Sequence, residues 1–177
     1  MVSPAHKALA REAAQKSMVL LKNERVEGND HPLLPIDLAQ VKHLAVIGKL
    51  AAVANIGDTG SSMVRPPYVV TPLEGLRTAA GKACRIVYND GRSTGRAVDA
   101  ARGTDAVVVV VGCTCKDEGE YLFGRSGDRD ALTLKRRDEA LIMAVAAANP
   151  KTVVVLVGGC AIVTESWREK VPAILMA

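Results

Sequence analysis

Five short apolar runs, rich in β-branched residues, recur along the chain and are separated by longer polar or mixed stretches. Such runs are typical of strands that are buried on both faces, as in parallel sheets. We predict strands over residues 41–48, 84–88, 106–111, 152–157 and 171–176. The run 106–111 reads AVVVVV and contains no polar residue. We therefore expect it inside the sheet and not at an edge.

Helical spacing of apolar residues fills most of the intervals between these runs. We predict helices starting near residue 5 and over 71–80, 95–102, 132–148 and 165–169, with residues 18–21 turning extended. Strands that alternate with helices indicate right-handed βαβ crossovers. The expected fold is an α/β three-layer sandwich with a mostly parallel, five- or six-stranded, flavodoxin-like sheet. We expect one domain over 1–177, truncated after Ala177 or completed by other polypeptide, because no covering helix follows the last strand.

Composition narrows the classes of function. Aromatic residues make up 3% of the chain, which argues against stacking platforms for carbohydrate or single-stranded nucleic acid. The net charge of +4 is scattered, and the densest basic patch, 135–137, is followed at once by Asp138 and Glu139, as at a helix start. The four cysteines lack zinc-site spacing, so we expect reduced thiols, a cytoplasmic location and no metal or cofactor. No signal peptide or membrane span is visible.

Two loops carry candidate chemistry. The loop after 106–111 runs to about Arg129 and contains Asp117, Glu118 and Glu120, at the strand end where open α/β sheets place ligands. A solvated surface loop is the alternative. The loop 49–70 contains GDTGSS at 57–62, followed by Arg65, without a phosphate-binding motif. A tight surface turn is the alternative there.

A series of segments in fixed order resembles the C-terminal α/β-sandwich domain of glycoside hydrolase family 3, the β-glucosidase and β-xylosidase family. The segments are 10–23 (AREAAQKSMVLLKN), 33–36 (LLPI), 45–48 (AVIG), 57–62 (GDTGSS), 66–76 (PPYVVTPLEGL), the EGE…GDR…LTL loop at 118–134, 149–159 (NPKTVVVLVGG) and 167–177 (WREKVPAILMA). Two stretches depart from the family pattern. Lys49-Leu50 replaces a more usual Pro-Asn, and 135–138 (KRRD) replaces a more usual Leu-Pro-x-x-Gln.

The resemblance implies a role in a retaining β-glycosidase that hydrolyses terminal nonreducing β-D-glycosides, either β-linked oligosaccharides or aryl glycosides. It places the acid/base on the loop after 106–111, with Glu120 as first choice and Glu118 as second. A separate (β/α)₈ barrel would supply the nucleophile, so we expect the isolated chain to be inactive and to self-associate through uncovered apolar surface. Asp58 and Arg65 are candidates for the substrate entrance.

Other readings of the same residues remain open. Asp128 and Arg129 are expected to fix the acid/base loop through an ion pair or a helix cap. The chain as a whole has an alternative role, as a non-catalytic α/β domain or a module that binds a small ligand or partner. No nucleic-acid or membrane partner is expected.

Overall fold

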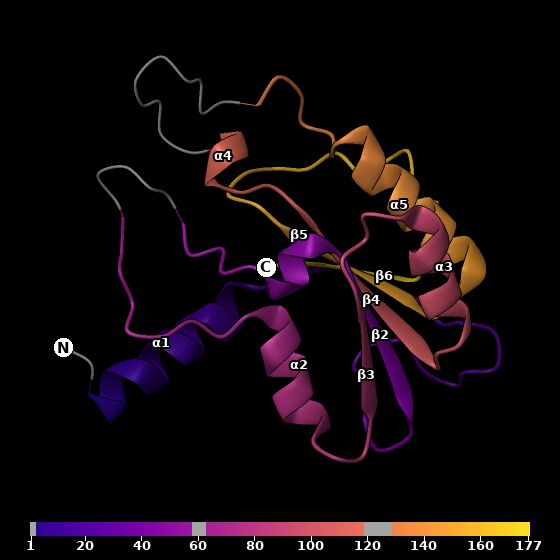
Figure 1. The fold of residues 1–177 in the computed structure, drawn as a ribbon, viewed down its shortest axis with the longest axis horizontal. Helices are drawn as coiled ribbons and strands as arrows, with labels where there is room; N and C mark the ends of the chain where they lie inside the picture. Colours follow the sequence, from indigo (N-terminus) through magenta and orange to yellow (C-terminus); the bar gives the residue numbers. More distant parts are fainter. Residues whose placement is uncertain (1–2, 58–62, 119–128) are drawn as a thin grey trace.

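The computed structural model describes residues 3–57, 63–118 and 129–177. A six-stranded sheet forms its centre, with the strand order β1-β6-β5-β4-β2-β3 (Figure 1). The strands are β1 (Val19–Asn23), β2 (His43–Ile47), β3 (Arg85–Asn89), β4 (Ala106–Gly112), β5 (Thr152–Val157) and β6 (Ala173–Met176). Strands β2 to β6 are parallel, and β1 pairs antiparallel with β6. The parallel strands follow flavodoxin-like order, which confirms the predicted fold class.

The valine-rich strand β4 lies between β2 and β5, as its composition predicts. All seven of its residues are buried. Val108 pairs with Val46 of β2 and with Val153 of β5, so β-branched side chains meet across three adjacent strands. Burial on both faces explains why this strand shows no polar alternation.

Helices cover the two faces of the sheet in three layers (Figure 1). Helices α3 (Thr94–Arg102) and α5 (Arg136–Ala148) pack on one face, where Ala97, Ala101, Ile142 and Val145 join the core. Helix α2 (Pro72–Ala80) and the 3₁₀ helix η1 (Lys49–Ala52) cover the other face over β2, β3 and β4. Because α2 and α3 lie on opposite faces, the chain reverses its winding direction between β2 and β4.

The start of α2 shows how local sequence fixes an element. Thr71 accepts a hydrogen bond from the backbone N–H of Glu74, and the Glu74 carboxylate accepts one from the Thr71 N–H at 2.9 Å. This capping box satisfies two N–H groups that a helix end leaves without partners, and Pro72 occupies the first turn, where its missing N–H costs nothing.

Several boundaries differ from the prediction. The helix predicted over 132–148 begins at Arg136, because Thr133 forms a parallel bridge with Val163 and Leu134 is buried. The predicted helix 165–169 is a turn followed by the 3₁₀ helix η2 (Arg168–Lys170). Two short elements, η1 and α4 (Cys115–Glu118), lie in stretches predicted as loop. Residues 18–21 were expected to be extended, and the structure places the strand β1 at Val19–Asn23.

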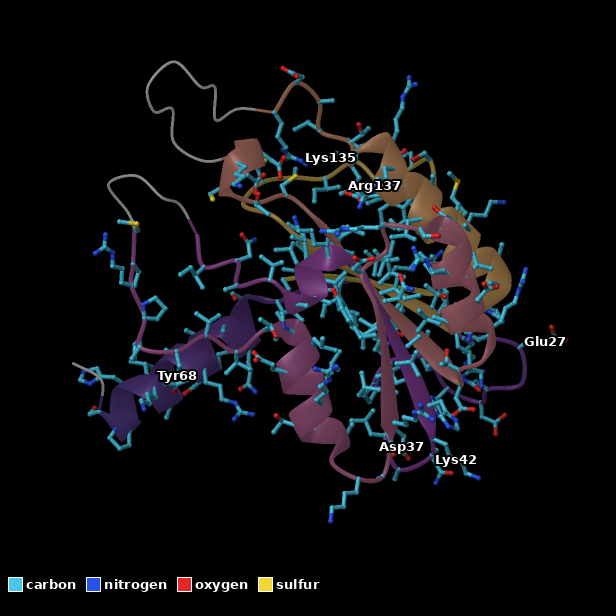
Figure 2. All side chains as sticks on the ribbon, in the orientation of Figure 1. Glu27, Asp37, Lys42, Tyr68, Lys135 and Arg137 are labelled. Carbon is cyan, nitrogen blue, oxygen red and sulfur yellow. The ribbon has the colours of Figure 1, made fainter. Side chains whose placement is uncertain are left out.

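Part of the molecule presents apolar side chains to solvent. Helix α1 (Pro4–Ser17) buries none of its residues, and Val19, Leu20 and Leu21 each expose more than half of their surface. Tyr68 lies beside α1, with the Lys7 ammonium 5.0 Å from its ring centre (Figure 2). We call α1 together with 18–21 the exposed apolar surface. Exposed apolar side chains that lie together in this way are suited to packing against another polypeptide.

Candidate active site

Two glycines shape the carboxyl edge of the sheet, where the candidate loops begin. Gly48 follows β2 with φ +113°, and Gly112 ends β4 with φ +142°. A Cβ at Gly48 would lie 2.1 Å from the Val110 carbonyl oxygen, and a Cβ at Gly112 would lie 1.9 Å from that of Val157. Both positions therefore require glycine, for conformation and for space. They bring the loops after β2, β4 and β5 close together.

The loop after β4 begins with a short, self-capped helix, α4. The Asp117 carboxylate accepts hydrogen bonds from the Thr114 N–H at 2.9 Å and from its hydroxyl at 3.2 Å. The backbone N–H groups of Asp117 and Glu118 donate in return to the Thr114 carbonyl. These reciprocal bonds fix α4 at the start of the loop after β4.

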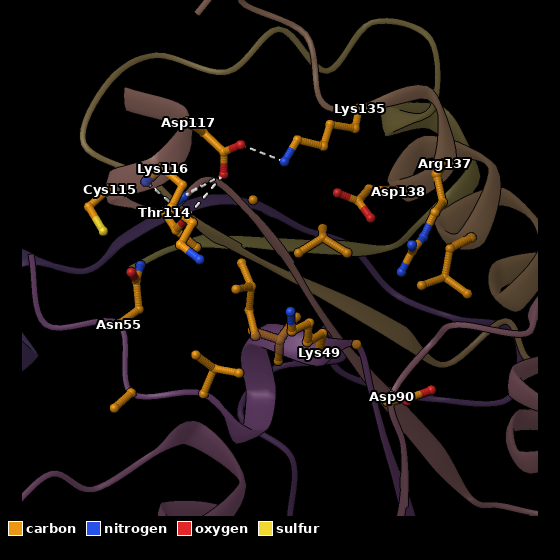
Figure 3. Close-up of a pocket in the computed structure, with 18 residues that line it drawn as sticks. Lys49, Asn55, Asp90, Thr114, Cys115, Lys116, Asp117, Lys135, Arg137 and Asp138 are labelled. Atoms are coloured by element: carbon orange, nitrogen blue, oxygen red, sulfur yellow. Dashed lines mark hydrogen bonds and ion pairs between the residues drawn. The ribbon is translucent and has the colours of Figure 1, made fainter. Parts of the chain in front are cut away.

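A salt bridge ties α4 to the beginning of α5. Lys135 Nζ lies 2.5 Å from Asp117 Oδ1 (Figure 3). Burial acts to raise the pKa of Asp117, but hydrogen bonds from Lys135 and Thr114 outweigh it, so the pKa lies below its usual range. The bond to Asp117 in turn raises the pKa of Lys135.

A second ion pair closes the base of the same loop. Arg129 Nε lies 3.3 Å from Glu118 Oε2, and the two side chains are 8% and 15% exposed. The two residues flank 119–128, so the ion pair joins the described parts of the chain on either side of this segment. Glu118 Oε1 also accepts a hydrogen bond from the Gly159 N–H after β5. We call Glu118, Arg129 and their partners after β5 the loop clamp.

Arg129 makes the remaining contacts of the loop clamp. Its Nη2 donates to the Ala161 carbonyl oxygen at 2.7 Å and contacts Cys160 Sγ, while Nη1 lies 3.6 Å from Cys113 Sγ. Cys160 Sγ donates to Glu118 Oε2 at 3.4 Å. Burial raises the pKa of the Cys113 thiol. Arg129 thus joins the loops after β4 and β5. It contacts four residues, namely Cys113, Glu118, Cys160 and Ala161.

Removing the arginine of the loop clamp should destabilise the domain measurably. We expect Arg129→Met to lower the free energy of unfolding by roughly 2–4 kcal/mol, because a largely buried Glu118 carboxylate loses its counter-charge. Arg92→Met is the control, since the Arg92–Asp90 pair is 73% and 41% exposed. Such exposed pairs contribute roughly 0–1 kcal/mol.

Urea unfolding of Arg129→Met, Glu118→Gln and the double variant measures the coupling between the two side chains. The double variant should lose less stability than the two single changes added together. Strict additivity, or equal small losses for Arg129→Met and Arg92→Met, would show that the loop clamp does not stabilise the domain.

A cavity of about 480 Å³ lies beside α4, at the carboxyl ends of β2, β3 and β4. The loop after β2, α4 and the first turn of α5 surround it (Figure 3). Its charged lining residues are Lys49, Asp90, Lys116, Asp117, Lys135, Arg137 and Asp138. Burial raises the pKa of the Asp138 carboxyl, and the charges of Arg137 and Lys135 offset only part of that effect.

The structure separates the predicted site residues. Glu118 lies in the loop clamp, and Arg129 forms the ion pair that the sequence suggested for it. Glu120, Asp58 and Asp128 lie outside the described residues. Arg65 is exposed and has no salt bridge within the parts of the chain that the structure describes.

Sequence reasoning missed the cavity residues Lys49, Arg137 and Asp138. The basic run 135–137 was the available sequence signal for this cavity. It was ambiguous, because such a run also occurs at helix starts that line no cavity. Within the described ranges no group of three or more His, Cys, Asp or Glu side chains could hold a metal ion. No described helix is long and apolar enough to span a membrane.

The geometry defines a doubly wound α/β domain whose charged loops meet at the edge where such sheets bind ligands. The sequence profile described as the glycosyl hydrolase family 3 C-terminal domain matches residues 18–177. The chain therefore belongs to glycoside hydrolase family 3, and it corresponds to the C-terminal domain of that family.

Individual relatives agree with this assignment. A β-xylosidase from Formosa agariphila is 33% identical over 96% of this chain, and a thermostable β-glucosidase B from Acetivibrio thermocellus is 32% identical over 98%. The crystal structure of a β-glucosidase from Erythrobacter marinus superimposes with a TM-score of 0.84 at 30% identity, covering 99% of this chain. The chain spans 24%, 22% and 26% of these three proteins.

Proposed function

We propose that the chain is the acid/base-supplying domain of a retaining β-glycosidase that acts on terminal nonreducing β-D-glycosides. Its family membership and the names of its relatives, β-xylosidase and β-glucosidase, support this activity. The observation that carries the proposal is the loop clamp, which joins Glu118 and Arg129, the residues on either side of 119–128, at the carboxyl edge of the sheet. A retaining mechanism needs a carboxylic acid held about 5–5.5 Å from the nucleophile, and a loop tied at its base can provide such positioning.

Within this loop we propose Glu120 as the acid/base and a positioning role for Glu118. Both carboxylate oxygens of Glu118 are engaged, one by Gly159 and the other by Arg129 and Cys160. A general acid must bring a carboxyl oxygen within hydrogen-bond reach of the glycosidic oxygen, and neither oxygen of Glu118 is free to do so. Glu120 follows two residues later, beyond the fixed end of α4.

The proposal assigns the other half of the chemistry to a (β/α)₈ barrel that supplies the nucleophile. Asp58 and Arg65 would lie at the substrate entrance that faces this barrel. The exposed apolar surface would pack against further polypeptide, and without it the chain would self-associate. The free thiols of all four cysteines support a reducing, cytoplasmic compartment.

Activity measurements on aryl β-D-glucosides and aryl β-D-xylosides test this function. The 177-residue chain alone should release no aglycone, because it has at most one of the two required carboxylates. Covalently joined to a family 3 barrel, it should hydrolyse at least one of the two substrates. Hydrolysis by the chain alone would overturn the division of labour, and failure of every barrel fusion that folds would overturn the proposed activity.

A further inference from the structure

The cavity beside α4 occupies the position where this fold reverses its winding. Helix α2 carries the chain from β2 to β3 on one face, and α3 carries it from β3 to β4 on the other. The loops after β2 and β4 therefore diverge and leave a crevice between them, which is where open α/β sheets bind ligands. The volume of about 480 Å³ suits a ligand of monosaccharide size.

Some charged side chains around the cavity form salt bridges and others do not. Lys135 is paired with Asp117, and Asp90 is paired with Arg92, which lies outside the lining. Lys49, Lys116 and Arg137 have no salt bridge among the described residues. Three basic side chains without a salt bridge thus line the cavity, against one such carboxylate, that of Asp138, on which the charges of Arg137 and Lys135 act. This excess favours an anionic ligand.

The basic groups come from separate elements that converge on one space. Lys49 begins η1, and Arg137 lies in the first turn of α5 (Figure 3). The first turn of α5 has no side-chain cap, so its positive end adds to the same field.

The remaining lining groups suit hydroxyls. Asp138 has no salt bridge within the described chain, and its carboxylate can accept hydrogen bonds from sugar hydroxyls. Asn55 donates its amide N–H to the Cys113 carbonyl at 3.3 Å, which leaves its own oxygen as an acceptor. Among the described residues no aromatic side chain lines the cavity, so a nucleotide base would find no stacking partner among them.

We propose that this cavity binds a monosaccharide that carries one anionic group, with Lys49 and Arg137 holding the anion and Asp138 accepting from hydroxyls. Such a ligand would bridge the loop after β2 and α5, next to the Lys135–Asp117 salt bridge that holds α4. Binding would therefore stiffen the base of the loop that carries Glu120. The binding itself does not rest on the proposed hydrolase activity.

Isothermal titration calorimetry on the 177-residue chain tests the proposal with D-glucose 6-phosphate and D-glucuronate. At least one of them should bind with a Kd of about 1 mM or tighter. Neutral D-glucose and inorganic phosphate should each bind at least about tenfold more weakly, because each lacks half of the recognised chemistry. Preference for the 6-phosphate ester or for the free 6-carboxylate of the same hexose scaffold assigns the anionic group.

Matched variants locate the binding. Arg137→Gln and Lys49→Gln should each weaken binding about tenfold, through loss of a charged hydrogen bond. Arg136→Gln, one residue away and outside the lining, should change Kd by less than about twofold. A cooperative thermal unfolding transition checks that each variant is folded. Because Arg137→Gln and Lys49→Gln change different elements, each tests the location of the binding site independently.

Three results would overturn the proposal: no heat of binding for either anionic sugar at about 10 mM, binding of D-glucose as tight as that of its anionic derivatives, or equal losses in Arg136→Gln and Arg137→Gln. Because no hydrolysis is measured, failure here leaves the proposed glycosidase activity unaffected. Sugar binding by the chain, together with failure of every folded barrel fusion to hydrolyse a glycoside, would refute the activity alone.

Discussion

In an active enzyme that carries this chain, Glu120→Gln is expected to slow hydrolysis of substrates with poor leaving groups by about 10²–10⁴-fold. An alkyl or sugar leaving group needs a proton as the glycosidic bond breaks, and the amide cannot supply one. An activated aryl leaving group departs without protonation, so its first step should be nearly unchanged. Measurement of kcat/KM for both leaving-group classes with one sugar isolates this difference.

Glu118→Gln is the matched comparison, because it changes the same functional group two residues earlier. We expect it to lower kcat/KM for both leaving-group classes by a similar factor, since loosening of the loop clamp misplaces Glu120 for every substrate. The same change should also lower the melting temperature, because it removes the charge that pairs with Arg129 and weakens the hydrogen bond from Gly159. Selective loss with poor leaving groups in Glu118→Gln would transfer the acid/base role to Glu118.

The second large effect concerns the glycine at the end of β4. Gly112→Ala should lower the free energy of unfolding by at least about 4 kcal/mol, because the new Cβ would lie 1.9 Å from the Val157 carbonyl oxygen. The residue also has φ +142°, which an alanine adopts only with strain. For a domain of this length we expect the melting temperature to fall by about 10 °C or more.

Gly95→Ala provides the control for that experiment. Gly95 lies in the first turn of α3, its φ is not positive, and nothing lies within 4 Å of a Cβ placed there. Alanine should therefore stabilise the chain by about 0.4–1 kcal/mol. Circular dichroism melting of both variants makes the comparison, and a Gly112→Ala variant as stable as Gly95→Ala would show that the close approach of β4 to β5 is not a constraint.

The strand β4 shows what the sequence pattern can determine. Its valine run can only be stable when both faces are buried, so its place inside a parallel sheet followed from local composition. The start of α5 was less determined, because the apolar Leu132 and Leu134 continue the helical spacing. Tertiary contacts decided that boundary, through the bridge of Thr133 to Val163.

The loop clamp and the cavity could be predicted only in part. The Asp-Arg pair at the end of the loop indicated an ion pair, but the partner was open. Glu118 reaches Gly159, which is 41 positions away along the chain, and that contact depends on the order of β4 and β5 in the sheet. The convergence of Lys49 and Arg137 likewise requires the reversal of winding between β2 and β4, which periodicity alone does not locate.

Azide rescue tests the central claim most directly, namely that this domain supplies the acid/base of a retaining β-glycosidase through Glu120. In Glu120→Gln, turnover of an activated aryl β-glycoside should stall at the glycosyl-enzyme, because no general base activates water. Added sodium azide should restore turnover and yield a glycosyl azide of β configuration, while Glu118→Gln should give no such product. Rescue in Glu118→Gln alone, or in neither variant, would contradict this account.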